Sequence, residues 1–178
     1  SHGSISAVYT GFEQHRVRIG AGLQQEDLYK TQESKNFTFV NGVLTPLTGM
    51  VDASGNPALV FILPHKRNVS FAFLQDEWNI VKDWTLTAGL RHDNYSDIGG
   101  STNPRLALVW DAAYNVVVKA MHGEAFRAPS FIEQYNINNP VIIGSPNIKP
   151  ETITTDELAF SWQPVDKLQP NLTFSYSR

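Results

Sequence analysis

The sequence contains no cysteine among its 178 residues. This absence excludes a disulfide framework, thiolate metal sites and a cysteine nucleophile, although it does not identify the compartment. The sequence also lacks an apolar run of about 18 residues and therefore predicts no transmembrane helix. The formal net charge of −3 is small and gives no reason to expect a nucleic-acid partner. Because a transmembrane β-strand needs only about ten alternating residues, these absences remain compatible with a membrane barrel.

Motifs of catalysis are also missing. The sequence has no GxSxG, HExxH or phosphate-binding loop, and Ser130 follows a proline without a nearby histidine partner. No two of the five histidines stand at metal-ligand spacing; they are His2, His15, His65, His92 and His122. We therefore expect no catalytic residue, no metal site, no cofactor and no enzymatic activity. An outer-membrane barrel lipase or protease is the rival hypothesis, which mutation of Ser130 and the histidines would test.

What the sequence does contain is a recurring alternation of apolar and polar residues. In the segment 84–95, for example, Leu86 and Leu90 alternate with Thr87 and Arg91. Such a period of two predicts a strand with one apolar face and one polar face. The predicted strands are 4–9, 15–23, 68–80, 84–95, 103–111, 115–127, 155–163 and 171–177. The sequence thus predicts an all-β fold, an antiparallel meander of about eight strands.

The connections between these strands are unequal in length. The short connections are 11–14, 81–83, 112–114 and 164–169, and the longer ones are 28–67, 96–102 and 128–153. Short and long connections alternate strictly, as they do in outer-membrane barrels. The four tryptophans all lie near the short connections; they are Trp78, Trp84, Trp110 and Trp162. We interpret them as an aromatic girdle at one membrane boundary rather than as caps on a soluble core.

Two soluble folds also produce alternating strands. A β-sandwich has hairpins but rarely a loop as long as 28–67, and a lipocalin-like closed barrel has about eight strands. Because periodicity cannot distinguish the inside of a barrel from its outside, a soluble ligand-binding β-barrel or β-sandwich without a transport role remains the alternative.

Five motifs distinguish between the membrane barrel and the soluble folds. They are Gln75-Asp76-Glu77-Trp78, Thr87-Ala88-Gly89-Leu90-Arg91-His92-Asp93, Asn103-Pro104-Arg105, Gly123-Glu124-Ala125-Phe126-Arg127-Ala128-Pro129-Ser130 and Asn147-Ile148-Lys149-Pro150-Glu151-Thr152. The order and the spacing of these motifs resemble those of the TonB-dependent outer-membrane receptors. The resemblance covers the chain from about Val69 to its end. The resemblance implies that 1–178 is a slice of a 22-stranded barrel without its plug domain. It also implies that 28–67 and 128–153 are extracellular loops.

The resemblance further implies a function and partners. The intact receptor would bind and import a metal chelate, most often a ferric siderophore, with energy supplied through TonB. Its partners would be TonB, the plug domain and outer-membrane lipid, and its location the outer membrane of a Gram-negative bacterium. Eight strands cannot close a barrel sized for 22. We therefore expect this chain to self-associate through its open strand edges.

The motif around Arg127 predicts the rim of the barrel. Phe126 and Arg127 end one strand, and Pro129 fits a place where the chain leaves the sheet because proline cannot donate to the ladder. Arg127 could approach an anionic ligand or form an ion pair in the barrel wall, and we favour the ion pair. The segment Lys149-Pro150-Glu151 is expected to fix the return of the loop to the next strand.

The loop 28–67 is rich in apolar residues. By resemblance, its aromatic residues Phe37, Phe39 and Phe61 are candidates for ligand contact. The local pattern predicts a hairpin of 36–44 with 58–63, because Asn41-Gly42 is a strong signal for a tight turn. The hairpin does not exclude ligand contact.

Two groups of charged residues need a separate interpretation. Four arginines fall on the polar faces of strands and would line the lumen; they are Arg16, Arg18, Arg91 and Arg105. Packing against a plug explains them, since arginine pairs well with carboxylates. The oxygen ligands of Asp93, Asn94 and Asp97 would suit calcium, but their spacing favours a solvated turn.

Overall fold

The structure is a computed structural model that describes residues 1–139, 141–165 and 167–178. Pro140 and Asp166, which fall within the predicted loop 128–153 and the predicted turn 164–169, lie outside the described residues. The described chain forms two compact units. The sheet unit contains residues 1–24, 68–127 and 151–178, and the loop unit contains residues 25–67 and 128–150.

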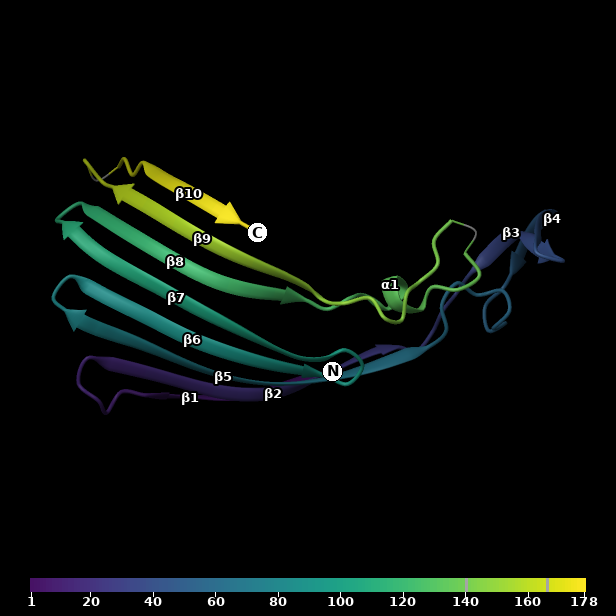
Figure 1. Cartoon of the computed structure of the whole chain (residues 1–178), viewed down its shortest axis with the longest axis horizontal. Helices are drawn as coiled ribbons and strands as arrows, with labels where there is room; N and C mark the ends of the chain where they lie inside the picture. The colour runs from purple at the N-terminus through teal and green to yellow at the C-terminus, as the bar shows by residue number, and fades with distance from the viewer. Residues whose placement is uncertain (140, 166) are drawn as a thin grey trace. The chain divides into compact units, whose positions relative to one another are not determined.

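One antiparallel sheet of eight strands makes up the sheet unit, and two of these strands continue into the residue range of the loop unit. The strands are β1 (His2–Tyr9), β2 (His15–Leu28), β5 (His65–Val81), β6 (Trp84–Tyr95), β7 (Gly99–Ala113), β8 (Val116–Arg127), β9 (Glu151–Trp162) and β10 (Asn171–Ser177). Their order in the sheet follows the chain, as Figure 1 shows, with β1 and β10 at the two edges. This arrangement confirms the predicted meander of eight antiparallel strands.

The connections differ from the prediction at one place. β7 already begins at Gly99, so only Ser96–Ile98 connect it to β6, whereas the connection 163–170 is longer. The predicted strict alternation of short and long connections is therefore wrong. The cause is a tight turn, in which Gly99 adopts a φ of +86°. The glycine pair in the sequence marks this turn, not a long loop.

The register places apolar residues from six neighbouring strands, β5 to β10, on one face of the sheet. Directly opposite residues of an antiparallel pair share a face. One row contains Trp84, Trp110, Val118, Phe160 and Leu172, and the next contains Leu86, Leu108, Ala120, Leu158 and Phe174. We call this the apolar face. The other, polar face carries Thr87, Arg105 and Lys119, so the predicted alternation holds across neighbouring strands.

All four tryptophans lie on the apolar face, near the same end of the sheet. Trp84 is opposite Trp110, and their rings stack with centroids 5.0 Å apart and planes 14° apart. Trp78 is opposite Leu86, and Trp162 is opposite Val116. Many of the large apolar side chains of this face are exposed, including Leu74, Leu90 and Leu106. An apolar face of this extent is suited to an apolar surrounding such as lipid.

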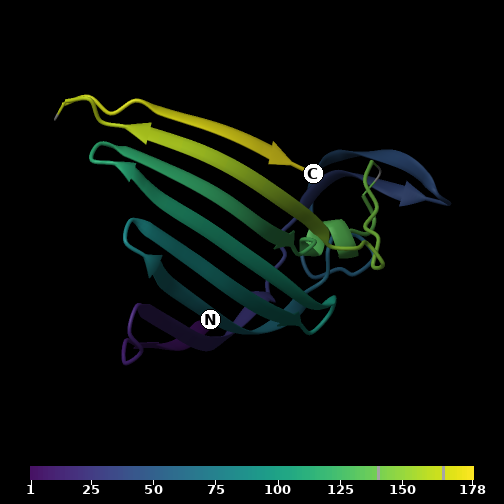
Figure 2. The same cartoon turned by 60° about the vertical axis from the view of Figure 1, so that its left-hand side comes forward.

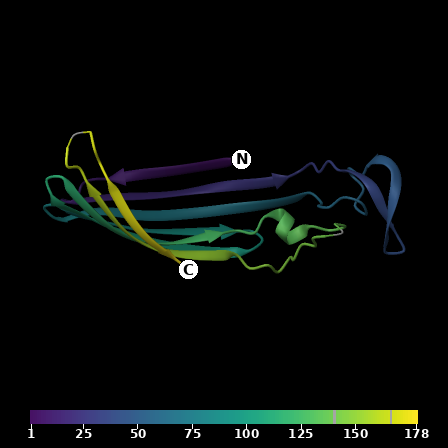
Figure 3. The ribbon, with the colours of Figure 1, turned by 90° about the horizontal axis from the view of Figure 1, so that it is seen from above.

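The loop unit contains a second, two-stranded sheet. Its strands β3 (Ser34–Val40) and β4 (Val43–Asp52) are antiparallel, and they lie side by side in Figures 2 and 3. Asn41 and Gly42 form the turn with φ values of 53° and 79°, as the Asn-Gly pair predicts. The predicted partner strand 58–63 is wrong, because β3 pairs with β4 instead.

A local turn explains why 58–63 is not a strand. The side chain of Asn56 accepts a hydrogen bond from the amide of Ala58 at 3.0 Å. Its carbonyl accepts from the amides of Leu59 and Val60, at 2.9 and 3.0 Å. These bonds coil the segment and bury Val60 inside the loop unit. An asparagine that bonds its own backbone thus outweighs the apolar run.

The loop unit also contains a short helix, α1 (Phe131–Tyr135), which the sequence analysis treated as part of a loop. Ser130 and Glu133 form a capping box: the hydroxyl of Ser130 accepts from the amide of Glu133, and the carboxylate of Glu133 accepts from the amide of Ser130 at 2.7 Å. The S-x-x-E pattern was therefore the signal that could have predicted the helix. No helix in the described part of the chain is long and apolar enough to cross a membrane.

Candidate functional site

The predicted rim residue Arg127 lies opposite Glu151 in the sheet, where β8 and β9 end and begin. Its Nε donates to the Glu151 carboxylate at 3.0 Å, and both side chains are more than half exposed. Phe126 contacts Tyr95, with ring centroids 5.4 Å apart. Pro129 is buried in the loop unit. The ion pair joins the two strands at the rim, and a ligand-binding role for Arg127 stays a prediction.

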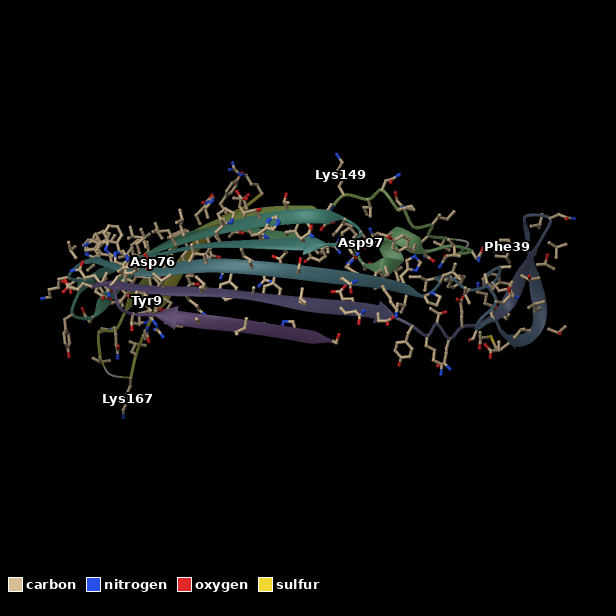
Figure 4. All side chains as sticks on the ribbon, turned by 90° about the horizontal axis from the view of Figure 1, so that it is seen from below. Tyr9, Phe39, Asp76, Asp97, Lys149 and Lys167 are labelled. Carbon is tan, nitrogen blue, oxygen red and sulfur yellow. The ribbon has the colours of Figure 1, made fainter. Side chains whose placement is uncertain are left out.

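The second rim segment lies where the chain returns to the sheet. Lys149 is exposed and extends away from the ribbon in Figure 4. Pro150 is half-buried and directly precedes β9, which begins at Glu151. Because proline cannot donate to the ladder, its place immediately before the strand is the one expected for it.

Two of the three aromatic candidates lie beside one lysine, and the third lies against one of these two rings. The ammonium of Lys35 lies 3.6 Å from the ring centroid of Phe61 and 5.5 Å from that of Phe37. The rings of Phe37 and Phe39 meet edge to face with centroids 6.0 Å apart. Phe39 remains exposed, and Phe37 and Phe61 are half-buried. We call these four residues the aromatic cluster.

Further contacts hold the aromatic cluster in place. The ammonium of Lys35 pairs with the Glu33 carboxylate at 3.1 Å and donates to the carbonyl of Leu59. The other oxygen of Glu33 accepts from the amide of Phe61 at 2.7 Å. Lys35 is therefore buried with its charge compensated. Neither Lys35 nor Glu33 stands in a recognisable sequence motif, so the sequence does not predict this site.

A buried arginine that belongs to no predicted site lies at the start of β5. Arg67 is only 3% exposed, and its Nη2 donates to the carbonyl of Pro129 at 2.9 Å and to Oε1 of Gln134 at 2.7 Å. Its guanidinium also lies 4.9 Å from the ring centroid of Phe131. A lone arginine at the end of an apolar segment carries no sequence signal for such a contact.

The polar face of the sheet contains a hollow of about 360 Å³ lined in part by Arg18, Arg91 and Arg105. These arginines share one face, as the alternation predicts. Arg91 forms an ion pair with Asp93, because its Nε and Nη2 donate to the two carboxylate oxygens of Asp93 at 2.8 and 2.6 Å. Asp93 is only 6% exposed. The interpretation of this residue as part of a solvated turn is therefore wrong, because its charge is paired and buried within the strand.

The part of the chain that the structure describes contains no group of three or more histidine or carboxylate side chains that could hold a metal ion. Two histidine–carboxylate pairs do lie on the apolar face. His15 contacts Asp76 at 2.7 Å, and His122 contacts Asp156 at 2.6 Å. Each is a cross-strand pair that reduces the cost of a polar side chain on an apolar surface.

A single antiparallel meander with one apolar face bounded by tryptophans and one polar face defines the wall of an outer-membrane-type β-barrel. The family model described as "TonB dependent receptor-like, beta-barrel" matches residues 4–177. The chain therefore belongs to the β-barrel family of the TonB-dependent receptors.

Individual relatives agree with this family. The vitamin B12 transporter BtuB of Vibrio cholerae serotype O1 is 34% identical over 91 residues, which cover 51% of this chain and 14% of that protein. The ferric enterobactin receptor of Pseudomonas aeruginosa is 23% identical over 192 residues, covering 98% of this chain and 24% of that protein. The chain thus spans less than a quarter of the length of these two relatives.

A solved structure shows the same fold. The siderophore receptor PirA from Pseudomonas aeruginosa superposes with a TM-score of 0.69 at 22% identity, covering 99% of this chain and 30% of that chain. The family is one of receptors and transporters rather than of enzymes.

Proposed function

We propose that the chain is a wall segment of an outer-membrane active transporter that binds and imports a metal chelate, a ferric siderophore, with energy supplied through TonB. The observation that carries the proposal is the segregation of the sheet into an apolar and a polar face within a TonB-dependent receptor family. The apolar face would contact outer-membrane lipid of a Gram-negative bacterium. The polar face, with its arginine-lined hollow, would contact a plug domain that closes the barrel.

The names of the relatives and the aromatic cluster support a chelate as the ligand. The relatives are named for vitamin B12 and for ferric enterobactin. Phe39 offers an exposed ring, and Phe61 and Phe37 lie beside the Lys35 ammonium. An exposed ring offers a surface on which an aromatic chelate can stack.

Arg127 would contribute to ligand contact only by leaving its ion pair. Since Arg127 and Glu151 are more than half exposed, the pair is worth at most about 1 kcal/mol. An anionic chelate could therefore exchange with Glu151 at small cost. Lys149 is exposed and would remain in solvent.

Growth of an iron-limited bacterium tests the proposal. A Gram-negative strain without its own siderophore receptors would express the intact receptor that contains this chain, supplied with ferric catecholate or ferric hydroxamate chelates. We expect growth that requires TonB and that falls in the Phe39→Ala and Phe61→Ala variants. Phe12→Ala is the control, because Phe12 is an even more exposed ring that lies in the connection between β1 and β2. Growth without TonB, or no growth on any metal chelate, would contradict the proposal.

The soluble alternative makes a different prediction. A β-sandwich would cover the apolar face with a second sheet, but the second sheet of the described residues is the short β3–β4 hairpin of the loop unit. A soluble protein would also stay monomeric at high concentration without detergent. We expect the chain to require detergent instead.

A further inference from the structure

The loop unit contains a pair of buried polar side chains that the proposed function does not use. Arg67 is 3% exposed and Gln134 is 1% exposed, in a unit whose surface is otherwise largely accessible. Burying such groups is unfavourable unless each polar atom has a partner. The hydrogen bond of 2.7 Å between Arg67 and Gln134 offsets part of the desolvation cost of burying both side chains.

Arg67 connects the base of one loop with the start of the other. Arg67 lies near the start of β5, the strand that follows the segment 29–64. It donates hydrogen bonds to Pro129 and Gln134, which belong to the segment 128–150. His65, two residues earlier, stacks on Tyr135 of α1 with ring centroids 3.9 Å apart. The helix is thus held at both ends, by an arginine that donates two hydrogen bonds and by a stacked ring.

A second set of contacts joins the segment after α1 to the coil at 56–61. The amide of Ile137 donates to the carbonyl of Phe61 at 2.6 Å. The side-chain amide of Asn138 donates to the carbonyls of Val60 and Pro57, at 3.0 and 3.1 Å. Asn138 adopts a φ of +56°, a conformation that asparagine tolerates better than most residues.

Phe61 is the member of the aromatic cluster that contacts the segment after α1. Its carbonyl binds Ile137, its amide binds the carboxylate of Glu33, and its ring lies against Lys35. A displacement of the segment 136–138 would therefore move Phe61 and change the surroundings of Lys35. The path from Arg67 to the cluster is a continuous series of packed and hydrogen-bonded groups.

We propose that Arg67 is a positioning residue that joins the loops 29–64 and 128–150 into one cooperative unit and so sets the aromatic cluster before a ligand arrives. The coupling of the loops stands on the contacts alone, and only its consequence for ligand affinity rests on the proposed function. Arg67 does not touch the cluster. It acts through α1, the segment 136–138 and Phe61.

Amide hydrogen exchange on the whole chain refolded in detergent tests the coupling. In Arg67→Met we expect the amides of Ile137 and Phe61 to exchange at least about tenfold faster, and by similar factors, because both belong to one cooperative unit. Amides in the middle of β6 and β7 should keep their rates. Lys66→Gln is the matched control, because the neighbouring Lys66 forms an exposed ion pair with Asp27 and should leave all of these amides unchanged.

Faster exchange at Ile137 with an unchanged rate at Phe61 would overturn the proposal, because the two loops would then open independently. Unchanged rates at both amides would overturn it as well. Loss of protection throughout the sheet would show that Arg67→Met fails to fold, and a second pair of variants then decides. Gln134→Leu removes the acceptor of the buried bond, whereas Gln134→Glu retains it. We expect rapid exchange in the first variant and nearly unchanged exchange in the second; equal rates in the two variants would contradict the proposal.

Binding of an iron(III) catecholate complex to the intact receptor provides the functional measurement. If uncoupled loops hold the competent arrangement for a tenth of the time, the dissociation constant rises about tenfold in Arg67→Met. The same change is expected in Asn138→Gly, which keeps the positive φ but loses the side-chain amide. A wild-type receptor that binds no chelate while its loops exchange cooperatively would reject the proposed ligand and leave the coupling standing. Cooperative exchange with an unchanged dissociation constant in both variants would reject the positioning role.

Discussion

Replacing Gly22 by alanine should destabilise the sheet unit, because the space for a methyl group is already occupied. A Cβ at Gly22 would lie 2.5 Å from a ring atom of Phe71 and 2.7 Å from the carbonyl oxygen of Gly3 in the adjacent strand. The ring cannot retreat freely, since the guanidinium of Arg91 lies 4.0 Å from its centroid. The carbonyl oxygen belongs to the β1–β2 pair and can move only with its strand.

The magnitude follows from the cost of overpacking. Inserting a methyl group into filled space costs about 1–3 kcal/mol, which lowers the folding equilibrium constant by about 5- to 140-fold. Gly3→Ala is the matched control, because nothing lies within 4 Å of its Cβ position. Both variants lose one strand glycine, so the difference between them isolates the clash.

Equilibrium unfolding of the detergent-refolded chain by guanidinium, followed by tryptophan fluorescence, measures this difference. Gly22→Ala should unfold at lower denaturant than Gly3→Ala with an unchanged slope. Adding Phe71→Leu should recover only part of the loss, because the carbonyl of Gly3 remains in place. If Gly22→Ala and Gly3→Ala unfold at the same concentration, the close approach of Phe71 to the glycine does not hold the sheet in its register, and the reasoning fails.

Three further predictions concern other parts of the chain. The hydrogen bonds from the side chain and the amide of Ser54 hold the pKa of Asp52 below its ordinary value; the stabilisation they give is present above that ordinary value and is lost as the pH falls through the lowered pKa. Ser54→Ala should raise the pKa of Asp52 part of the way back in an NMR titration, and an unchanged titration curve would refute the assignment. Single-tryptophan variants in bilayers should be quenched at similar depth near the headgroups, whereas quenching at widely different depths would exclude a girdle. Without detergent the chain should self-associate through β1 and β10, whose outer edges have no partner strand among the described residues; a monodisperse monomer would contradict this.

The sheet could be predicted from the sequence because its signal is local and repeated. Alternation with a period of two places Leu86 and Leu90 on one face without knowledge of any partner strand, and the same is true of Trp110. Glycine weakens that inference at strand ends. The pair Gly99-Gly100 predicts a loop, but the positive φ of Gly99 produces a tight turn, and β7 begins directly at Gly99.

The loop unit could be predicted only in part, since its structure depends on contacts between distant residues. The Asn41-Gly42 turn needed two adjacent residues and was predicted correctly. The burial of Arg67 depends on Gln134, which stands far along the chain, and no periodicity relates the two. The helix α1 is an intermediate case: its capping box was visible in the sequence but was not used.

The two-bond ion pair between Arg91 and Asp93 changes the electrostatic potential on the polar face of the sheet. A count of arginines from the sequence assigns each one a full positive charge on the polar face. The carboxylate of Asp93 neutralises one of these charges within the same strand, leaving Arg18 over the ring of Phe73 and Arg105 exposed. Electrostatic attraction of an anion along this wall should therefore be weaker than the composition implies. The rate at which an anion enters should therefore fall with rising ionic strength, but less steeply than it would if all three arginines were unpaired.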